Sequence, residues 1–184
     1  MANVVTNVTA GKPNISGAVY RADLPATLPT DATTSLDAGF KLMGYCSDDG
    51  VTNSNTPDTT DIKAWGGDTV LNIQTSKDDT FKFTMLEVLN LDVLKAVYGS
   101  SNVTGALASG ITVKANSDEA EEGAWVIEMV LREGAVKRVV IPDAKISDIG
   151  DITYSDSDAV GYEVTLTAMP DTSGNTHYEY IIRT

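Results

Sequence analysis

Hydrophobic and polar residues alternate along most of this chain, and the pattern changes to a helical period only once, within residues 81–99. At its start, Phe81 and Phe83 would share one side of a strand, because side chains at alternate strand positions point the same way. Further on, apolar residues recur every three or four positions, the spacing of one helix face. Asn90 is a good N-cap and Gly99 can supply the residue that ends a helix. The stretch therefore predicts a strand followed by one short helix, which packing against the rest of the protein must stabilise.

Alternating runs before and after this unit predict further strands. One of the clearest is a hairpin that turns at Glu133–Gly134, and Pro142 is expected to end its second strand. About ten short strands and one helix predict a mainly β protein of two packed antiparallel sheets, either a sandwich or a flattened barrel, with one short α-helix. The runs that predict these other strands are 15–20, 40–46, 62–65, 70–75, 111–115, 125–131, 135–141, 148–155, 160–169 and 177–183.

No internal repeat or linker divides the chain, so residues 1–184 are expected to form a single domain. Residues 1–14 are polar and punctuated by Gly and Pro, which predicts a mobile N-terminal arm. Residues 21–39 and 47–61 are predicted to be long loops, and loops of this length in a compact domain usually bind something. The side chains expected to contact a neighbouring subunit are Leu24, Leu28, Leu36, Asp48 and Asp49.

Charge and cysteine content exclude several classes of protein. The 184 residues include 26 acidic and 13 basic side chains, for a formal net charge of −13. Proteins that grip nucleic acid need clustered Lys and Arg for the phosphates, so this balance argues against such a surface. Cys46 is the single cysteine, and no internal disulfide can form. No secretory signal and no apolar run of membrane-spanning length is found, so no membrane partner is expected.

Candidate catalytic groups are few. Asp171, Ser173 and His177 lie on one turn and its exit, where three side chains rarely converge on a substrate. Cys46 could act as a nucleophile with His177 only if the fold joins them, and it is more typical of a small buried residue. No nucleotide-binding, hydrolase or metalloprotease motif is present. We therefore expect no catalytic residue, no cofactor and no enzyme activity.

Two binding chemistries were weighed. The segment 156–161 begins like a calcium loop but lacks the acidic residue that completes one, so no metal site is expected. Four aromatic side chains could form a platform for sugars, although aromatic residues on strands are more often buried. A surface-adhesion or carbohydrate-binding β-sandwich therefore stays open as the alternative function. The four aromatic residues are Trp65, Trp125, Tyr154 and Tyr162.

The order of several segments resembles the major tail tube proteins of long-tailed, siphovirus-type bacteriophages, and the similarity runs through most of the chain. Each segment alone is a weak signature, and it is their shared order that carries the resemblance. The segments are Gly17–Ala22 with the following Leu-Pro-Thr-Asp-Ala-Thr, the Gly-Tyr-Cys-Ser-Asp-Asp-Gly stretch at 44–50, Trp65-Gly-Gly, Phe81–Glu87, Leu91–Gly99 and Gly161–Asp171.

This resemblance implies a structural virion protein. In that family six copies form a ring, rings stack into a tube, and inner strands join into one β-barrel around a lumen through which DNA leaves the virion. The implied partners are further copies of the chain and other tail proteins, such as the tape measure, initiator and terminator. Viral DNA would pass without specific binding. The implied location is the virion tail, assembled in the cytoplasm of the host bacterium. The resemblance leaves open whether the tail is contractile.

The polar faces of inner strands would line the lumen that the resemblance implies. Glu163, between Gly161 and Thr165 on an alternating strand, is the first candidate for a lumen residue, and Glu128 is the second. The acidic excess would suit a channel that repels DNA. Charge alone does not place these carboxylates in the lumen, since a solvated outer surface would accommodate them equally well.

Overall fold

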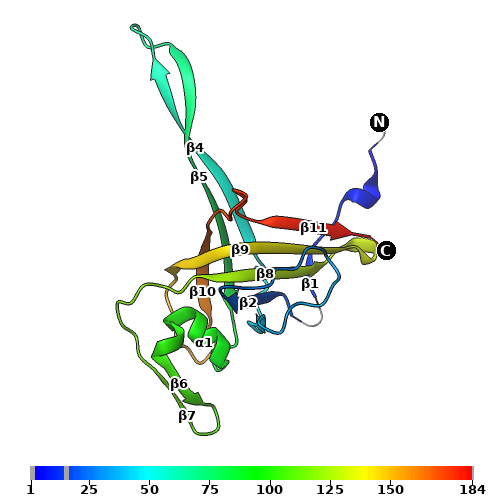
Figure 1. Cartoon of the computed structure of the whole chain (residues 1–184), viewed down its shortest axis with the longest axis vertical. Coiled ribbons are helices and arrows are strands. Elements are labelled where there is room, and N and C mark those ends of the chain that lie inside the picture. The colour runs from blue at the N-terminus through cyan, green and yellow to red at the C-terminus, as the bar shows by residue number, and fades with distance from the viewer. Residues whose placement is uncertain (1–2, 15–16, 184) are drawn as a thin grey trace.

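The computed structural model describes residues 3–14 and 17–183 and shows a mainly β protein with one α-helix in the described part (Figure 1). Ile15, expected to begin the first strand, and residues 1–2 of the predicted arm lie outside the described residues. The elements are β1 (Lys12–Pro13), β2 (Val19–Asp23), β3 (Lys41–Leu42), β4 (Thr52–Lys63), β5 (Thr69–Met85), α1 (Leu91–Tyr98), β6 (Val103–Ala106), β7 (Gly110–Val113), β8 (Gly123–Val130), β9 (Val136–Ile149), β10 (Tyr162–Ala168) and β11 (Tyr178–Ile182). Short 3-10 turns lie at Val5–Asn7, Ser100–Asn102 and Arg132–Gly134.

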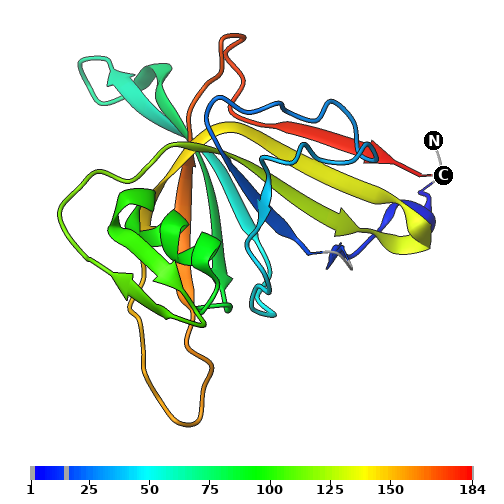
Figure 2. The same ribbon diagram turned by 60° about the horizontal axis from the view of Figure 1, so that its bottom comes forward.

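Most strands belong to one large antiparallel sheet in the order β3-β2-β8-β9-β10-β5-β4, with β1 beside β8 and β11 beside β9. A small second sheet consists of β6 and β7. Strand β9 belongs to both halves of the large sheet, and the halves turn away from each other along it (Figure 2). The predicted mainly β fold with antiparallel sheets and one short helix is confirmed. The large sheet is folded over and does not close into a barrel.

Pro142 lies inside β9, so the prediction that it ends the strand was wrong. Strand β9 pairs with β11 as far as Val140 and with β10 from Ala144 onward. Pro142 therefore sits where the partner strand changes, and its missing N–H donor removes no hydrogen bond to either partner. Pro142 is itself buried, and β9 continues past it to Ile149. The predicted strand at 148–155 is correspondingly reduced, because residues 150–161 form a loop.

The main core lies between the two halves of the sheet and is closed by α1. Trp125 on β8, Phe83 on β5 and Leu166 on β10 are almost completely buried there. Helix α1 begins as predicted, since the Asn90 side chain accepts a hydrogen bond of 3.0 Å from the backbone N–H of Asp92. Its buried residues are Val93, Leu94, Ala96 and Val97. The single predicted helix and its packing role are confirmed.

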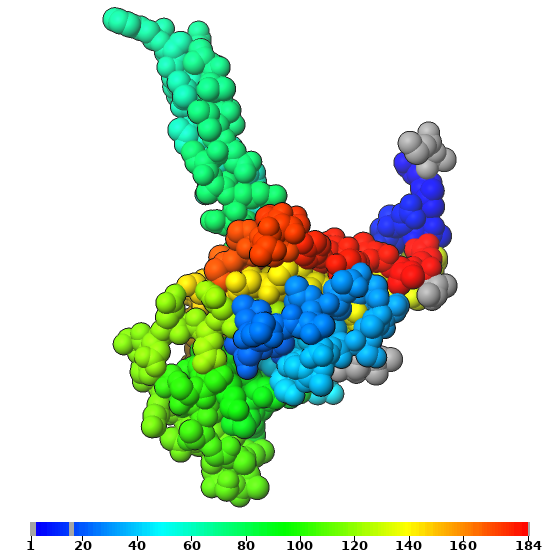
Figure 3. All heavy atoms as spheres, viewed as in Figure 1, coloured from blue at the N-terminus to red at the C-terminus, as the bar shows by residue number. Residues whose placement is uncertain are grey.

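Strands β4 and β5 form a long hairpin that projects from the body (Figures 1 and 3). The prediction of a loop over 47–61 was therefore wrong for residues 52–61, which belong to β4. The runs 62–65 and 70–75 are likewise parts of these two long strands and not separate short ones. All of β4 is exposed, so its stability comes from the backbone ladder with β5, and neither face needs the apolar residues that mark a strand in sequence.

Residues 24–39, by contrast, contain no strand, as predicted, whereas residues 21–23 of the predicted loop belong to β2. Phe40 was expected to begin a strand and lies just before β3. Residues 24–39 cross the face of the sheet that is turned away from the main core. Phe40 joins Ala22, Ala124, Val126 and Val140 in a second core cluster, and Leu28 and Leu36 pack against it. The loop therefore has a role within the subunit, because it covers apolar residues that would otherwise be exposed.

The described part of the N-terminal arm, residues 3–14, contacts the body of the subunit at several points, and its predicted mobility remains a prediction. Strand β1 pairs with the end of β8. The Thr9 hydroxyl accepts a hydrogen bond of 2.8 Å from the backbone N–H of Arg132, and the Arg183 guanidinium donates to the Thr6 carbonyl at 3.0 Å. These contacts join the arm to the β8–β9 turn and to the C-terminal strand.

Candidate functional site

One broad polar surface lies on the half of the sheet formed by β4, β5, β10 and the second part of β9. In β10 and in β5 from Asp79 onward the core-facing residues are buried and the residues between them point outward, while β4 is exposed along its whole length. Cross-strand pairing places the outward residues in rows, because paired residues of antiparallel strands lie on the same face. We call this surface the open face, defined by Thr52, Ser54, Thr80, Lys82, Thr84, Lys145, Asp148, Glu163, Thr165 and Thr167.

Glu163 lies near the middle of the open face, as its alternating position predicted for a residue outside the core. Its Oε1 atom is 2.9 Å from the Nζ atom of Lys82 on the neighbouring strand, and the two side chains are 46% and 53% exposed. The hydrogen bond and the charge of Glu163 raise the pKa of the Lys82 ammonium. The sequence analysis missed Lys82, since the register between β5 and β10 decides which cation meets which carboxylate.

Both sides of this half-sheet end in strand edges that have no strand partner among the described residues. Strand β4 pairs only with β5. On the other side, the part of β9 beyond Ala144 pairs only with β10, because β8 does not extend past Gly123. Exposed edges present unpaired backbone donors and acceptors, which are suited to pairing with another chain.

The tip of the β4–β5 hairpin carries exposed apolar side chains. Trp65 in the turn is fully exposed. On one face of the ladder Ile62 is paired with Leu71, and Ile73 follows two positions along β5. All three are at least 43% exposed. A bare cluster of this kind on a projecting hairpin is typical of an interaction surface.

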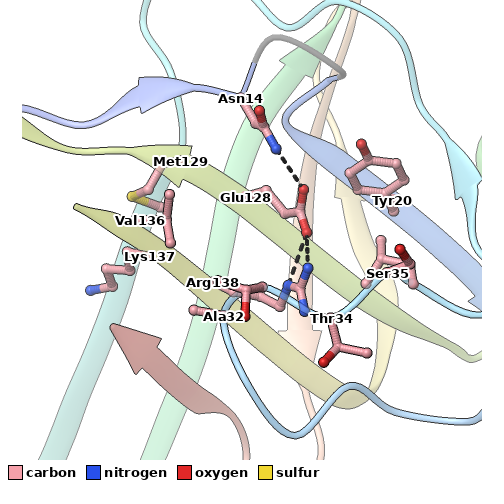
Figure 4. A pocket seen from close by; sticks show the side chains of 12 residues that line it. Asn14, Tyr20, Ala32, Thr34, Ser35, Glu128, Met129, Val136, Lys137 and Arg138 are labelled. Carbon is pink, nitrogen blue, oxygen red and sulfur yellow. Dashed lines mark hydrogen bonds and ion pairs between the residues drawn. The ribbon is translucent and has the colours of Figure 1, made fainter. Parts of the chain in front are cut away.

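Glu128, the second lumen candidate, is buried and does not line an open surface (Figure 4). The Arg138 guanidinium donates to its Oε1 atom through Nε at 2.9 Å and also through Nη2, and the Asn14 amide donates to Oε2 at 2.9 Å. Residues 31–36 of the long loop run beside this pair, where Arg138 also donates to the Asp31 carbonyl at 2.8 Å. A small pocket of about 480 Å³ lies between the loop and the two strands. A signal for this burial is present in the sequence, because Val126 and Val130 on the same face as Glu128 are apolar, as expected for a strand that is covered on both sides.

The predicted loop contacts have different surroundings. Asp48 and Asp49 are exposed in a turn closed by a hydrogen bond of 3.0 Å from the Gly50 N–H to the Ser47 carbonyl. This turn borders a groove of about 930 Å³ between the arm and the loop after β3. Leu24 is 40% exposed, whereas Leu28 and Leu36 face the chain's own second cluster. A role for these residues in contacts between subunits remains a prediction.

The candidate catalytic residues do not come together. His177 contacts Asp79, with its Nδ1 atom 2.5 Å from Oδ2. Asp171 accepts a hydrogen bond of 2.6 Å from the Tyr178 hydroxyl. Burial raises the pKa of the Cys46 thiol to about 11, which disfavours the nucleophilic thiolate.

The binding chemistries considered from the sequence also lack a site in the described part of the chain. Within residues 3–14 and 17–183, no group of three or more His, Cys, Asp or Glu side chains could hold a metal ion. Ser155, Ser157 and Asp158 hydrogen-bond to one another in the segment that begins like a calcium loop. Trp125 and Tyr162 are buried, so they cannot join Trp65 and Tyr154 in a surface platform for sugars.

Comparison with known proteins identifies a family for this chain. None of the described helices is long and apolar enough to span a bilayer. A search of curated proteins finds no match. A family model described as phage tail tube protein matches residues 5–184, nearly the whole chain.

Proposed function

Because this chain belongs to the phage tail tube protein family, we propose that its copies assemble into hexameric rings that stack into the tube of a virion tail. The tube is a structural conduit through which DNA is delivered to the host. Neither the family nor the described residues supply a reason to assign catalysis. The proposed location is the tail of the virion, after assembly in the cytoplasm of the host bacterium.

The observation that carries this proposal is the half-sheet with one open polar face and two unpaired edges. Pairing β4 of one subunit with the last part of β9 of the next would continue the sheet from copy to copy. Repeated around a ring, this pairing closes a barrel and removes both edges. The contact joins two different surfaces head to tail, the type of interface that generates rings or filaments.

In such a barrel the open face would form the inner wall. The core-facing side of β5 and β10 is already covered within the subunit by Trp125 of β8 and by α1, so the open face is the side that remains for solvent or DNA. Glu163 is then a lumen residue, and the buried Glu128 is left out of the lining. Rows of Thr and Ser side chains would give the lumen a hydrated polar surface without a cluster of cations. Because such a surface offers few contacts to phosphates, DNA is expected to pass without specific binding.

The projecting hairpin would contact other subunits. Its apolar tip, with Trp65, Ile62 and Leu71, would be covered by a neighbouring copy in the same ring or the next one. The exposed carboxylates of Asp48 and Asp49 and the side chain of Leu24 are further candidates for such contacts. Tape-measure, initiator and terminator proteins would complete the tail.

Electron microscopy of the purified protein, with analytical sedimentation over a range of concentrations, tests the proposal. We expect rings or tubes, formed without a cofactor and favoured by higher concentration. A protein that stays monomeric at every accessible concentration, and also in the presence of tail initiator components, would contradict it.

A further inference from the structure

Each of the two lysines on the open face is held by a carboxylate. The Nζ atom of Lys82 lies 2.9 Å from Oε1 of Glu163, and the Nζ atom of Lys145 lies 2.5 Å from Oε1 of Glu119. Among the residues that define the open face, these are the only Lys or Arg side chains, and the exposed Lys63 and Lys77 of the projecting hairpin are not among them. Both cations would otherwise be free to bind an anion.

The side chains around Lys82 would suit a phosphate group, but the lysine is already paired with a carboxylate. Lys82 is paired with Thr52 on one side and with Thr165 on the other, so hydroxyl groups flank it across the sheet. The Glu163 hydrogen bond and charge raise the pKa of Lys82, and Asp148 adds a smaller effect in the same direction. The ammonium, which any lysine carries at neutral pH, has Glu163 as its partner.

The backbone beside Glu163 leaves room for this arrangement. Gly150 donates its backbone N–H to the Glu163 carbonyl at 2.9 Å. A Cβ atom at position 150 would lie 2.9 Å from Oε1 of Glu163 and 3.2 Å from its Cβ atom. Any larger residue there would push the carboxylate out of its present position, so Gly150 acts as a positioning residue for the ion pair.

On the basis of the proposed function, we propose that Glu163 masks Lys82, which is a latent binding site for the phosphate backbone of double-stranded DNA. In a ring, one unmasked lysine per subunit becomes a belt of ammonium groups around the lumen. A protein that contacts several phosphates releases the same number of counterions, so its affinity for DNA rises steeply with each contact and falls steeply with salt. Glu163 thus acts by cancelling a nearby cation and not by repelling DNA.

The test uses full-length protein assembled into tubes in the presence of short, fluorescent double-stranded DNA. Tubes are sedimented, and the retained DNA is measured. For Glu163→Gln we expect about tenfold more retained DNA than for the wild-type protein at about 50 mM salt, and loss of the excess at about 200 mM. The double variant Lys82→Gln/Glu163→Gln should return to the wild-type value. Gly150→Ala, which displaces the carboxylate but keeps every charge, should give an intermediate increase.

The matched control is a variant that breaks a lysine–carboxylate pair located outside the open face. Lys137 and Glu179 lie 2.6 Å apart between β9 and β11, and Glu179→Gln should retain no more DNA than the wild-type protein. Unchanged retention by intact Glu163→Gln tubes would overturn the masking role. If Glu163→Gln prevents assembly, Gly150→Ala decides in its place. Equal retention by Glu163→Gln and the double variant would show that Lys82 is not the site.

Two further readouts separate this inference from the proposed function. If the wild-type protein forms no tubes in the microscope, the proposed function fails whatever the variants do. If Glu163→Gln tubes retain DNA that added nuclease digests freely, the open face lies outside the tube. In that case the masking of Lys82 stands, and the assignment of the lumen is wrong.

Discussion

The imidazole of His177 lies against the buried carboxylate of Asp79, with 2.5 Å between Nδ1 and Oδ2. Asp79 also accepts hydrogen bonds from the Thr176 hydroxyl at 2.6 Å and the Asn53 amide at 2.8 Å. The four side chains come from β4, β5 and the turn before β11. They fix the base of the hairpin to the body of the subunit.

Replacing Asp79 by Ala should therefore destabilise the folded subunit. The variant would leave the half-buried Thr176 and His177 without the carboxylate that pairs with them, and we expect a loss of about 1–3 kcal/mol in the free energy of unfolding. Urea unfolding of the monomer measures it. Asp78→Ala is the matched control, since Asp78 is exposed on the opposite face of the same strand. Equal losses in the two variants would contradict the role of the network.

The same network predicts how stability changes with acid. Burial of Asp79 opposes its ionisation, but hydrogen bonds from Thr176, His177 and Asn53 outweigh burial, and the pKa of Asp79 lies below its ordinary value. A carboxyl with a lowered pKa in the folded state adds stability that is complete above its unfolded pKa of about 4 and is lost as pH falls through the folded value. The wild-type protein should lose more unfolding free energy between neutral pH and about pH 3 than Asp79→Asn does. Parallel pH profiles would refute this.

Helix α1 provides a test of the core. Leu94 is 5% exposed and packs in the main cluster. Leu94→Ala should reduce the free energy of unfolding by about 2–5 kcal/mol, the range for a buried leucine. Leu89, just before the helix, is 63% exposed, and Leu89→Ala should change stability by less than about 0.5 kcal/mol. A loss that small at Leu94 would mean that the helix does not close the core.

The loop before β3 can be divided into an internal part and an external part. Leu36 packs against the second core cluster, whereas Leu24 is more exposed. Leu36→Ala should cost about 1–2 kcal/mol of unfolding free energy, less than full burial would give, because the side chain is only partly covered. Leu24→Ala should leave stability unchanged. Chemical denaturation of both variants decides, and a larger loss at Leu24 would reverse this division.

The hairpin is predicted to serve assembly and not folding. Replacing Thr60–Ile73 by Asn-Gly joins the paired residues Thr59 and Gln74 through a two-residue turn. The shortened protein should unfold at the same denaturant concentration as the wild type, yet form no tubes. Trp65→Ala should weaken assembly in the same direction, since Trp65 is fully exposed in the monomer. Normal tubes from the shortened protein would show that the hairpin makes no required contact.

Local signals in the sequence were sufficient for α1. Its period, its N-cap at Asn90 and Gly99 at its end are all contained in one stretch, and the structure reproduces each of them. The open face was also readable in part, because the alternation of β10 places Glu163 opposite the buried Val164 and Leu166. Where one face of a helix or strand is buried, the period of its hydrophobic residues predicts which face that is.

Contacts between segments far apart in the sequence could not be predicted in this way. Residues 52–61 are Asn, Thr, Ser, Pro and Asp with one strand partner and no buried face, so their composition is typical of a loop although they form most of β4. The pairing of this run with β5 is also irregular, because the register shifts between Asp58 and Thr59 and again between Ile62 and Lys63. Glu128 differs from Glu163 in its sequence neighbours, because Val126 and Val130 on its own face of β8 are apolar, whereas Gly161 and Thr165 flank Glu163.

Strand β9 has a mechanical consequence. Because its fourteen residues hold β8 and β11 at one end and β10 at the other, the two halves of the sheet share one continuous strand. A force that tilts one half is passed along a continuous backbone and a close-packed core into the other. Each subunit should then behave as a stiff block, and in the proposed tube any curvature would arise from small rotations between rings.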